Sequence, residues 1–192
     1  MKGIGKGRLS ADHSPKYERV ERERRYLLSE LPPGLKVNDR HAQITDNYLT
    51  NTRLRLRKVR WPATNEWTLK LTQKHAPGEP PDFSRTLITS IYLNEYEYEV
   101  LSVFEANEIR KNRYPYEHEG RKYSIDVFLG ALHGLILAET EFDTDEELRD
   151  FPAPPFAARE VTRDELFTGA RLVELTIDSL RAELARREAA GA

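Results

Sequence analysis

The stretch VERERRYLL, residues 20–28, carries ionised side chains at every second position: Glu21, Glu23 and Arg25. Successive side chains of a β-strand point to opposite faces, so these three groups would share one face. The other face would end on the aromatic ring of Tyr26. The sequence therefore predicts a strand with one fully charged face, which must meet water or a charged ligand.

The same alternation recurs along the chain between turn signals rich in Gly, Pro and Asn. Further strands are expected at 42–49, 52–60, 66–74, 85–93, 108–116, 122–129 and 135–142. Most connections are short, which favours antiparallel pairing. The pattern predicts a mainly antiparallel sheet of about seven or eight strands.

Helices are expected at three places. Asn94 and Glu97 form a capping-box pattern that predicts a helix from about 95 to 106. A second capping box predicts a short helix at 145–150. Apolar residues between Val173 and Leu184 are spaced four, three and four apart, as in a helix that covers an apolar sheet face.

Chain length and composition suit a single domain. The chain has 192 residues, of which 39% are hydrophobic and 32% are charged. This is enough for one domain with a sizeable core, expected at 18–192 and ending in the C-terminal helix. Residues 1–17 are rich in Gly, Lys and Ser and are expected to form a flexible tail.

Several functional classes are disfavoured by composition. The formal net charge of −2 argues against a basic nucleic-acid-binding surface, so no nucleic-acid partner is expected. The absence of Cys excludes disulfide scaffolds and thiolate metal sites. No apolar run is long enough to cross a membrane, and no signal-peptide pattern is present. We therefore expect a cytoplasmic protein with no membrane partner.

Like charges cluster on the expected strands. The carboxylates in strand-like alternation are Glu21, Glu23, Asp126, Glu139 and Glu141, and the cations are Arg55, Arg57, Lys70, Lys111 and Arg113. Like charges packed together oppose folding unless an opposite charge binds them. Carboxylates suit Mg²⁺ or Mn²⁺, and Arg and Lys bind phosphate. One explanation is a polyanion and a divalent metal inside a polar barrel; the other is an ordinary sheet face in water.

Taken together, these motifs resemble the CYTH superfamily, the triphosphate tunnel metalloenzymes. The segment from Glu21 to Arg25 is similar to the family's E-x-E-x-K strand. The later motifs follow in the family's order: RLRLR (53–57), WTLKL (67–71), EIRKNRY (108–114), IDVF (125–128), LAETEF (137–142) and REVTRDELF (159–167). The resemblance covers about residues 18–172.

The resemblance implies a fold, an activity and a cofactor. The fold is α+β: a closed or nearly closed eight-stranded antiparallel β-barrel, a tunnel, with helices packed outside. The activity is divalent-metal-dependent hydrolysis of a small triphosphate, with inorganic tripolyphosphate as the first expectation and Mg²⁺ or Mn²⁺ as the cofactor. Smaller members of the family often dimerise, so a homodimer is compatible with the resemblance.

The resemblance also assigns roles to individual residues. The metal ligands would be Glu21, Glu23, Asp126, Glu139 and Glu141. The triphosphate would be held by Arg25, Arg55, Arg57, Lys70, Lys111 and Arg113. The catalytic group would comprise Glu21, Glu23, Arg25 and Tyr48, the last in the segment DNYLT.

Two departures from the family pattern bear on the function. The motif's lysine is Arg25 here, and Lys and Arg are not interchangeable in a tightly fitted site. Many members also carry an E-x-E pair on the strand expected at 85–93, where this chain offers Leu87 and Thr89. The missing pair would remove one metal position, change the substrate, or leave a protein that binds without turnover.

Three alternatives to a triphosphatase therefore stay open. A class IV adenylate cyclase would use the same phosphate grip but would form cyclic AMP from ATP. A non-catalytic module would bind polyphosphate or nucleotides without cutting them. A purely structural β-domain would only present a charged face to water and would bind no phosphate compound.

Overall fold

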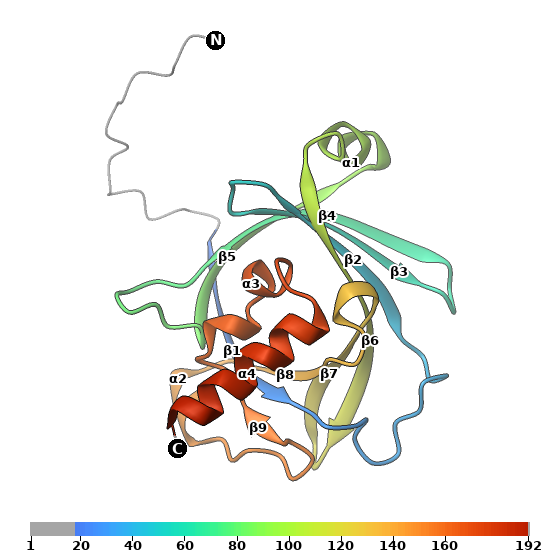
Figure 1. Cartoon of the computed structure of the whole chain (residues 1–192). Helices are drawn as coiled ribbons and strands as arrows, with labels where there is room; N and C mark the ends of the chain where they lie inside the picture. Colours follow the sequence, from blue (N-terminus) through green and yellow to red (C-terminus); the bar gives the residue numbers. More distant parts are fainter. Residues whose placement is uncertain (1–17, 192) are drawn as a thin grey trace.

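The computed structural model describes residues 18–191, so the tail expected at 1–17 lies outside the described residues. Eight antiparallel strands close into a barrel (Figure 1). Their bounds are β1 Arg19–Leu27, β2 Ala42–Leu49, β3 Leu54–Trp61, β4 Glu66–His75, β5 Arg85–Leu93, β6 Ala106–His118, β7 Arg121–Phe128 and β8 Ile136–Phe142. The order around the barrel is β5-β4-β3-β2-β6-β7-β8-β1, and pairing of β1 with β5 closes it.

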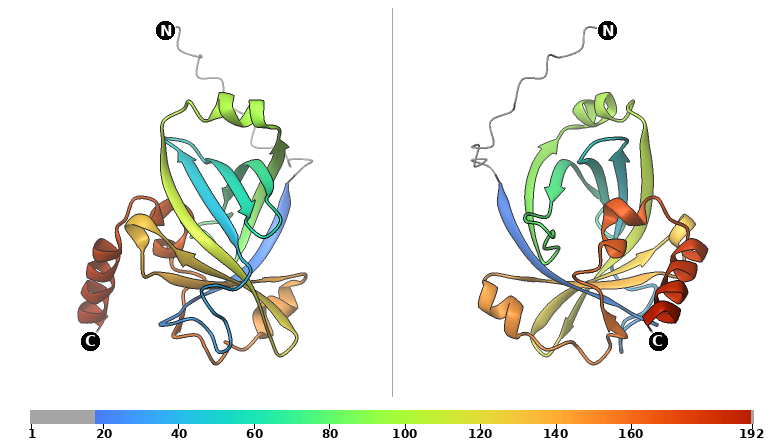
Figure 2. Two further views of the ribbon diagram at one scale, coloured as in Figure 1. Left: turned by 90° about the vertical axis from the view of Figure 1, so that its right-hand side faces the viewer. Right: turned by 60° about the vertical axis from the view of Figure 1, so that its left-hand side comes forward.

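Helices and a short ninth strand lie around the barrel. They are α1 Glu95–Leu101, η1 Gly130–Leu132, α2 Asp145–Asp150, β9 Arg159–Glu160, η2 Glu165–Phe167, α3 Gly169–Leu172 and α4 Ile177–Gly191. Figure 2 shows α1 and α2 at opposite ends of the molecule. The expected fold class, a closed antiparallel barrel with helices, is confirmed.

Alternation along the strands separates the barrel's two surfaces. On β1, Glu21, Glu23 and Arg25 line the interior, whereas Tyr26 is fully buried in a core outside the barrel wall. Cross-strand register places Glu23 opposite Glu141 on β8. Because directly paired residues point to the same face, the interior collects the charged side chains of adjoining strands.

Two apolar cores hold the barrel. One lies outside β1, β6, β7 and β8, where Tyr26 and Ile125 pack under residues of the loops that include Leu35 and Phe156. The other lies at one end of the barrel, where Phe167 and Leu180 from the C-terminal segment pack on inward-facing strand residues. Figure 1 shows α3 and α4 lying across this end.

The helices differ from expectation in two details. The helix predicted to run to 106 ends at Leu101, because residue 106 already pairs with Leu49 in the sheet and must be extended. The capping box of Asn94 and Glu97 is present. Val173 precedes α4 rather than belonging to it. No helix in the described part of the chain is both long and apolar enough to span a membrane.

Candidate functional site

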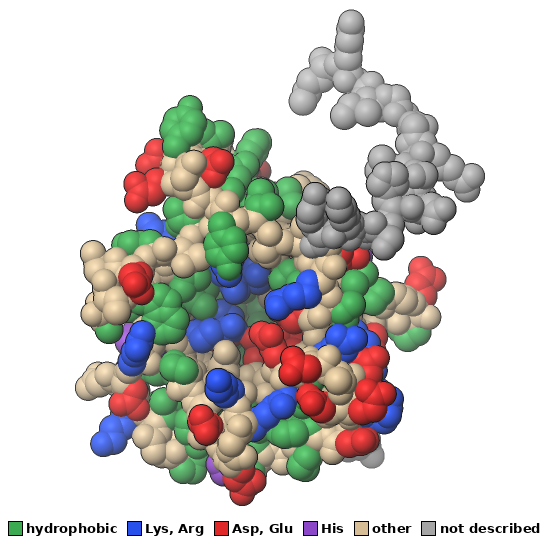
Figure 3. All heavy atoms as spheres, turned by 180° about the vertical axis from the view of Figure 1, so that it is seen from behind, with side chains coloured by type: hydrophobic (Ala, Val, Ile, Leu, Met, Phe, Trp, Pro, Cys, Tyr) green, Lys and Arg blue, Asp and Glu red, His purple; other side chains and the backbone are tan. Residues whose placement is uncertain are grey.

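A cavity of about 740 Å³ occupies the barrel interior. Inward-facing residues of most strands line it, and the segment 165–172 closes part of one end. Figure 3 shows the opposite face, where a hollow is bordered by Lys and Arg side chains and by Asp and Glu side chains. The cavity lies within the 300–1,000 Å³ range of small-molecule sites.

Eleven of the twelve residues singled out from the sequence line this cavity. They are Glu21, Glu23, Arg25, Tyr48, Arg55, Arg57, Lys70, Lys111, Arg113, Glu139 and Glu141. The twelfth, Asp126, is 0% exposed and lies behind Lys111 and Arg113. The structure therefore gathers the predicted set in one place, with one member buried beneath the surface.

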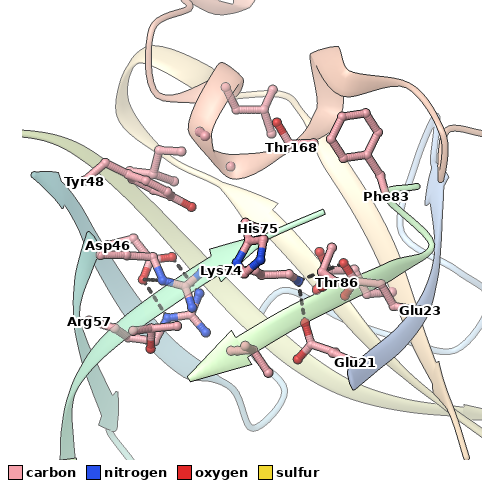
Figure 4. A pocket seen from close by; sticks show the side chains of 18 of the residues that line it. Glu21, Glu23, Asp46, Tyr48, Arg57, Lys74, His75, Phe83, Thr86 and Thr168 are labelled. Atoms are coloured by element: carbon pink, nitrogen blue, oxygen red, sulfur yellow. Dashed lines mark hydrogen bonds and ion pairs between the residues drawn. The ribbon is translucent and has the colours of Figure 1, made fainter. Parts of the chain in front are cut away.

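Four carboxylates form what we call the glutamate wall: Glu21 and Glu23 on β1, and Glu139 and Glu141 on β8. The ammonium group of Lys74 on β4 forms ion pairs with Glu21 and, at 3.0 Å, with Glu23 (Figure 4). Lys74 reaches these groups across β5, whose inward-facing side chains include the short Thr86.

Arg25 binds the middle of the glutamate wall. Its guanidinium group donates to Glu23 at 2.6 Å, to Glu139 at 3.2 Å and to the Phe167 carbonyl oxygen at 3.1 Å. Burial alone would raise the pKa of Glu139, but Arg113, Lys111 and Arg25 hold it well below its usual range. Glu139 is therefore ionised.

Two aspartates, which we call the buried aspartates, fix the cations of the facing wall. Asp46 is 2% exposed and accepts two hydrogen bonds from Arg57, at 2.6 and 2.7 Å. Asp126 accepts two from Arg113, both at 2.6 Å, and also binds Lys111. Bidentate bonds of this kind fix the plane and direction of a guanidinium group.

Burial and neighbouring charges shift the pKa values of Asp46 and of Lys111, the lysine bound to Asp126. Burial opposes ionisation of Asp46, yet Arg57 and Arg55 hold its pKa well below the usual range. Burial lowers the pKa of Lys111, and the positive charge of Arg113 acts in the same direction against the attraction of Asp126. Asp46 is thus a permanent anion that keeps two guanidinium groups in place.

Some charged groups that line the cavity lack a hydrogen-bond or ion-pair partner among the described residues. Among the described residues, the buried Nε of Arg55 has no hydrogen-bond partner, and Lys70 forms no ion pair. The Lys70 ammonium instead lies 4.7 Å from the centroid of the Tyr92 ring. Glu141 has no ion-pair partner in residues 18–191, and burial followed by the charges of Glu21 and Glu23 raises its pKa.

Tyr48 is held against the C-terminal segment. A Cβ atom placed on Gly169 would lie 1.8 Å from the Tyr48 hydroxyl oxygen. Only glycine fits at position 169 while the tyrosine keeps this position. The contact therefore ties the position of the Tyr48 hydroxyl group to the segment that closes one end of the barrel.

The strand β5 presents a neutral inner surface. Its cavity-lining residues include Thr86, Ile88 and Ser90, so the sequence alignment that placed Leu87 and Thr89 inside was wrong by one residue. A one-residue shift exchanges the two faces of a strand. The absence of an acidic pair on this strand holds in the corrected register.

Six Arg, Lys, Asp or Glu residues of the cavity were not assigned from the sequence: Arg19, Asp46, Arg53, Lys74, Glu165 and Arg171. Asp46 lies two residues before Tyr48, and Lys74 lies four after Lys70, so strand alternation gave a usable signal for both. Arg171 lies in α3, outside any strand, and had no such signal.

The chemistry of the glutamate wall suits a hard divalent cation, since carboxylate oxygens are the ligands that Mg²⁺ and Mn²⁺ prefer. The unpaired Glu141 beside Glu21 and Glu23 leaves negative charge that a cation would neutralise. Within residues 18–191, no group of three or more acidic or His side chains has a ready-made metal-binding arrangement. The donor set fits a metal, although the side chains also form ion pairs with Lys74, Arg25 and Arg113.

The fold and cavity define a closed antiparallel barrel with cationic and carboxylate walls. No family model matches the chain. An inorganic triphosphatase of Acetivibrio thermocellus is 38% identical over 96 residues, which cover 45% of this chain and 60% of that protein. This chain thus matches less than two thirds of that relative's length.

Two further comparisons extend over most of the chain. An inorganic triphosphatase of Nitrosomonas europaea is 27% identical over 165 residues, covering 80% of this chain and 96% of the relative. A crystal structure of an inorganic triphosphatase superimposes with a TM-score of 0.53 and 26% identity, covering 80% of this chain and 93% of that one. Both similarities cover 80% of this chain.

Proposed function

We propose that this chain hydrolyses a small triphosphate, with inorganic tripolyphosphate as the first substrate to test. The observation that carries the proposal is the 740 Å³ cavity, in which buried cations face a glutamate wall inside a closed barrel. The name inorganic triphosphatase, shared by relatives with the same fold, supports it. A linear triphosphate is a small polyanion that matches both the size and the charge of this site.

The phosphates would bind to the cationic side chains: Arg25, Arg55, Arg57, Lys70, Lys111 and Arg113. Lys70 would make the first new contact, because its ammonium group forms no ion pair in the described residues, and the Arg55 Nε, which lies 3.6 Å from Asp46 without a hydrogen bond, would follow. Arg57 and Arg113 are already oriented by the buried aspartates, so they would bind with little loss of side-chain entropy.

A divalent metal, Mg²⁺ or Mn²⁺, would be held by Glu21, Glu23, Glu139 and Glu141. When bound, such a metal neutralises charge that develops on phosphate oxygens. Asp126 was assigned to this set from the sequence. It is 0% exposed, does not line the cavity and accepts two hydrogen bonds from Arg113, so we propose that it orients the phosphate-binding cations instead.

Catalysis would depend on groups that this chain positions in advance. Arg25 is fixed by three hydrogen bonds and would place positive charge beside the phosphoryl group. The Tyr48 hydroxyl group, held against Gly169, would orient the phosphate chain relative to the attacking water. Preorganised charge and positioning of this kind supply most of the rate enhancement in phosphoryl transfer.

We further propose that residues 18–192 work as one cytoplasmic domain without a nucleic-acid or membrane partner. The continuous barrel and the small formal net charge of −2 support this proposal. A homodimer is compatible with it.

The neutral inner face of β5 favours one second candidate, a protein that binds polyphosphate or nucleotides without cutting them. Thr86, Ile88 and Ser90 supply no carboxylate where a second acidic pair would give a further metal position. Such a protein would use the same cations to grip the ligand but would lack turnover.

The test measures phosphate release from tripolyphosphate, thiamine triphosphate and ATP, each with Mg²⁺, with Mn²⁺ and with EDTA. Metal-dependent release, fastest from tripolyphosphate, is expected. Cyclic AMP formed from ATP would instead identify a cyclase. Tight calorimetric binding of tripolyphosphate without release of phosphate would identify the binding protein.

A further inference from the structure

A second cavity, of about 440 Å³, lies on the outer side of β1 and is separate from the barrel interior. Four of its lining residues are arginines: Arg24 on β1, Arg85 on β5, Arg149 on α2 and Arg163 after β9. Among the described residues that line it, Glu160 is the one acid. The volume lies within the range of small-ligand sites.

Arg24 is fixed in this cavity without losing its charge. Its Nε and Nη2 atoms donate to the main-chain carbonyl oxygens of Leu148 and Arg149, each at 2.8 Å. Its ion pair with Glu160 is long, at 3.4 Å. Carbonyl groups orient a guanidinium group but carry no net charge, so most of its positive charge stays available to a ligand.

The remaining cations differ in how far they are neutralised. Arg85 forms ion pairs with Asp82 at 2.7 Å and with Asp145 at 3.0 Å, which compensate its charge. Arg149 and Arg163 are exposed and form no ion pair with any residue in the range 18–191. The cavity thus holds one fixed and two free guanidinium groups against a single carboxylate.

Hydrogen bonds hold the carboxylate and hydroxyl groups of the outer cavity in fixed positions. The Thr162 hydroxyl group donates to Glu160 at 2.7 Å, which holds the carboxylate at one side of the cavity. Ser84 supplies a second hydroxyl group, fixed by a bond to Asp82 at 2.6 Å. Both hydroxyl protons are donated to carboxylates, so the guanidinium groups supply the donors that this concave site offers to an anion.

We propose that this outer cavity is a second anion site, which binds a phosphate oxyanion independently of the barrel interior. The ligand class follows from the planar fork of the guanidinium group, which binds two phosphate oxygens at once. The site does not depend on the proposed hydrolysis, because none of its arginines lines the barrel cavity.

The test is equilibrium dialysis of radiolabelled orthophosphate against the full chain in EDTA. Three proteins are compared with wild type: the outer variant Arg149→Gln/Arg163→Gln, the interior variant Lys70→Gln, and the control Arg181→Gln/Lys122→Gln. The control removes two exposed cations that form no ion pair within residues 18–191 and line neither cavity.

Orthophosphate is expected to bind at two classes of site in the wild type. The outer variant should weaken one class by about tenfold or more, the effect of losing a charge-assisted hydrogen bond. The interior variant should weaken the other class, and the control should match the wild type. Acetate at equal ionic strength should compete poorly.

Two results would overturn the proposal: unchanged phosphate binding in the outer variant, or equal competition by acetate. Circular dichroism on each variant checks that the fold is intact. Because dialysis measures binding alone, a failure of the proposed hydrolysis would leave this test unaffected.

Discussion

The buried aspartates and the glutamate wall are two sets of acidic residues that have different roles in the same barrel. Asp46 and Asp126 are 2% and 0% exposed, and each binds two of the cations that line the cavity. The glutamate wall faces the cavity. Its glutamates form ion pairs with cations that include Lys74 and Arg25, but Glu141 forms none in the described residues. Fully buried carboxylates position the cations that they bind, whereas Glu141, which lines the cavity without an ion pair, can attract a further cation.

The largest expected effect tests the positioning role of the buried aspartates. Asp126→Asn leaves Lys111 and Arg113 buried with a neutral partner, so the free energy of unfolding should fall by about 3–5 kcal/mol. Urea unfolding measures it. Glu108→Gln, which removes an exposed pair with Arg110, is the control and should change stability by less than about 1 kcal/mol. Equal losses in both variants would contradict the distinction.

The glutamate wall should be needed for turnover more than for stability. Glu21→Gln leaves Lys74 paired with Glu23, so the fold should be retained. Phosphate release from tripolyphosphate should fall by about 10²–10³-fold, as expected when one preorganised electrostatic group is lost. Glu66→Gln, on the exposed start of β4, is the matched control. A fully active Glu21→Gln protein would show that the wall has no part in catalysis.

The contact between Tyr48 and Gly169 joins the cationic side of the cavity to the C-terminal segment. Gly169→Ala would displace the Tyr48 hydroxyl group, because its Cβ would lie 1.8 Å from that oxygen, and should cost about 1 kcal/mol of stability or less, since the oxygen is at the free end of a side chain. In a Tyr48→Ala background the same change should cost little. A double-mutant cycle by urea unfolding measures the coupling, and additive effects would contradict the contact.

Acid unfolding tests the ionisation of Asp46. The pKa of Asp46 is depressed in the fold, so its contribution is present above the unfolded pKa of about 3.9 and is lost as pH falls through its folded pKa. Asp46→Asn should therefore be less stable at pH 7 but lose less stability between pH 5 and pH 3. Urea titrations across this range measure the slopes, and parallel curves would refute the assignment.

The smallest effect concerns Glu141. Its pKa is raised by burial and by Glu21 and Glu23, so its charged form is disfavoured in the fold. In EDTA, Glu141→Gln should stabilise the protein by no more than a few tenths of a kcal/mol, because Glu141 repels Glu23 directly opposite but is exposed, and water screens the repulsion. Added Mg²⁺ should raise the melting temperature of the wild type more than that of the variant. An equal rise in both would remove Glu141 from the proposed metal site.

Strand alternation predicted the strands and placed most of the lining residues on shared faces, whereas the closed barrel was expected from the family resemblance. The spacing of Arg55 and Arg57 sufficed to place both on one face, and a turn bounded each strand. Alternation could not reveal which acids become buried anchors, because this depends on cross-strand register. Asp46 lies opposite Arg57, and Arg113 lies opposite Asp126, and neither pairing is encoded in the spacing of a single strand.

Contacts between strands that are not adjacent could not be predicted from the sequence either. Lys74 reaches Glu21 across β5, which requires both the closed barrel and small side chains on the strand between them. Helical periodicity indicated an apolar face on the C-terminal segment. It could not indicate that Phe167 and Leu172 would pack at the end of the barrel and line its cavity.

The most direct test of the central claim is phosphate release from tripolyphosphate by the purified wild-type chain, with Mg²⁺ or Mn²⁺ and with EDTA. The charged cavity predicts release that requires the metal and stops in EDTA. No release with either metal, from protein that binds tripolyphosphate tightly by calorimetry, would contradict hydrolysis and identify a barrel that only binds its ligand.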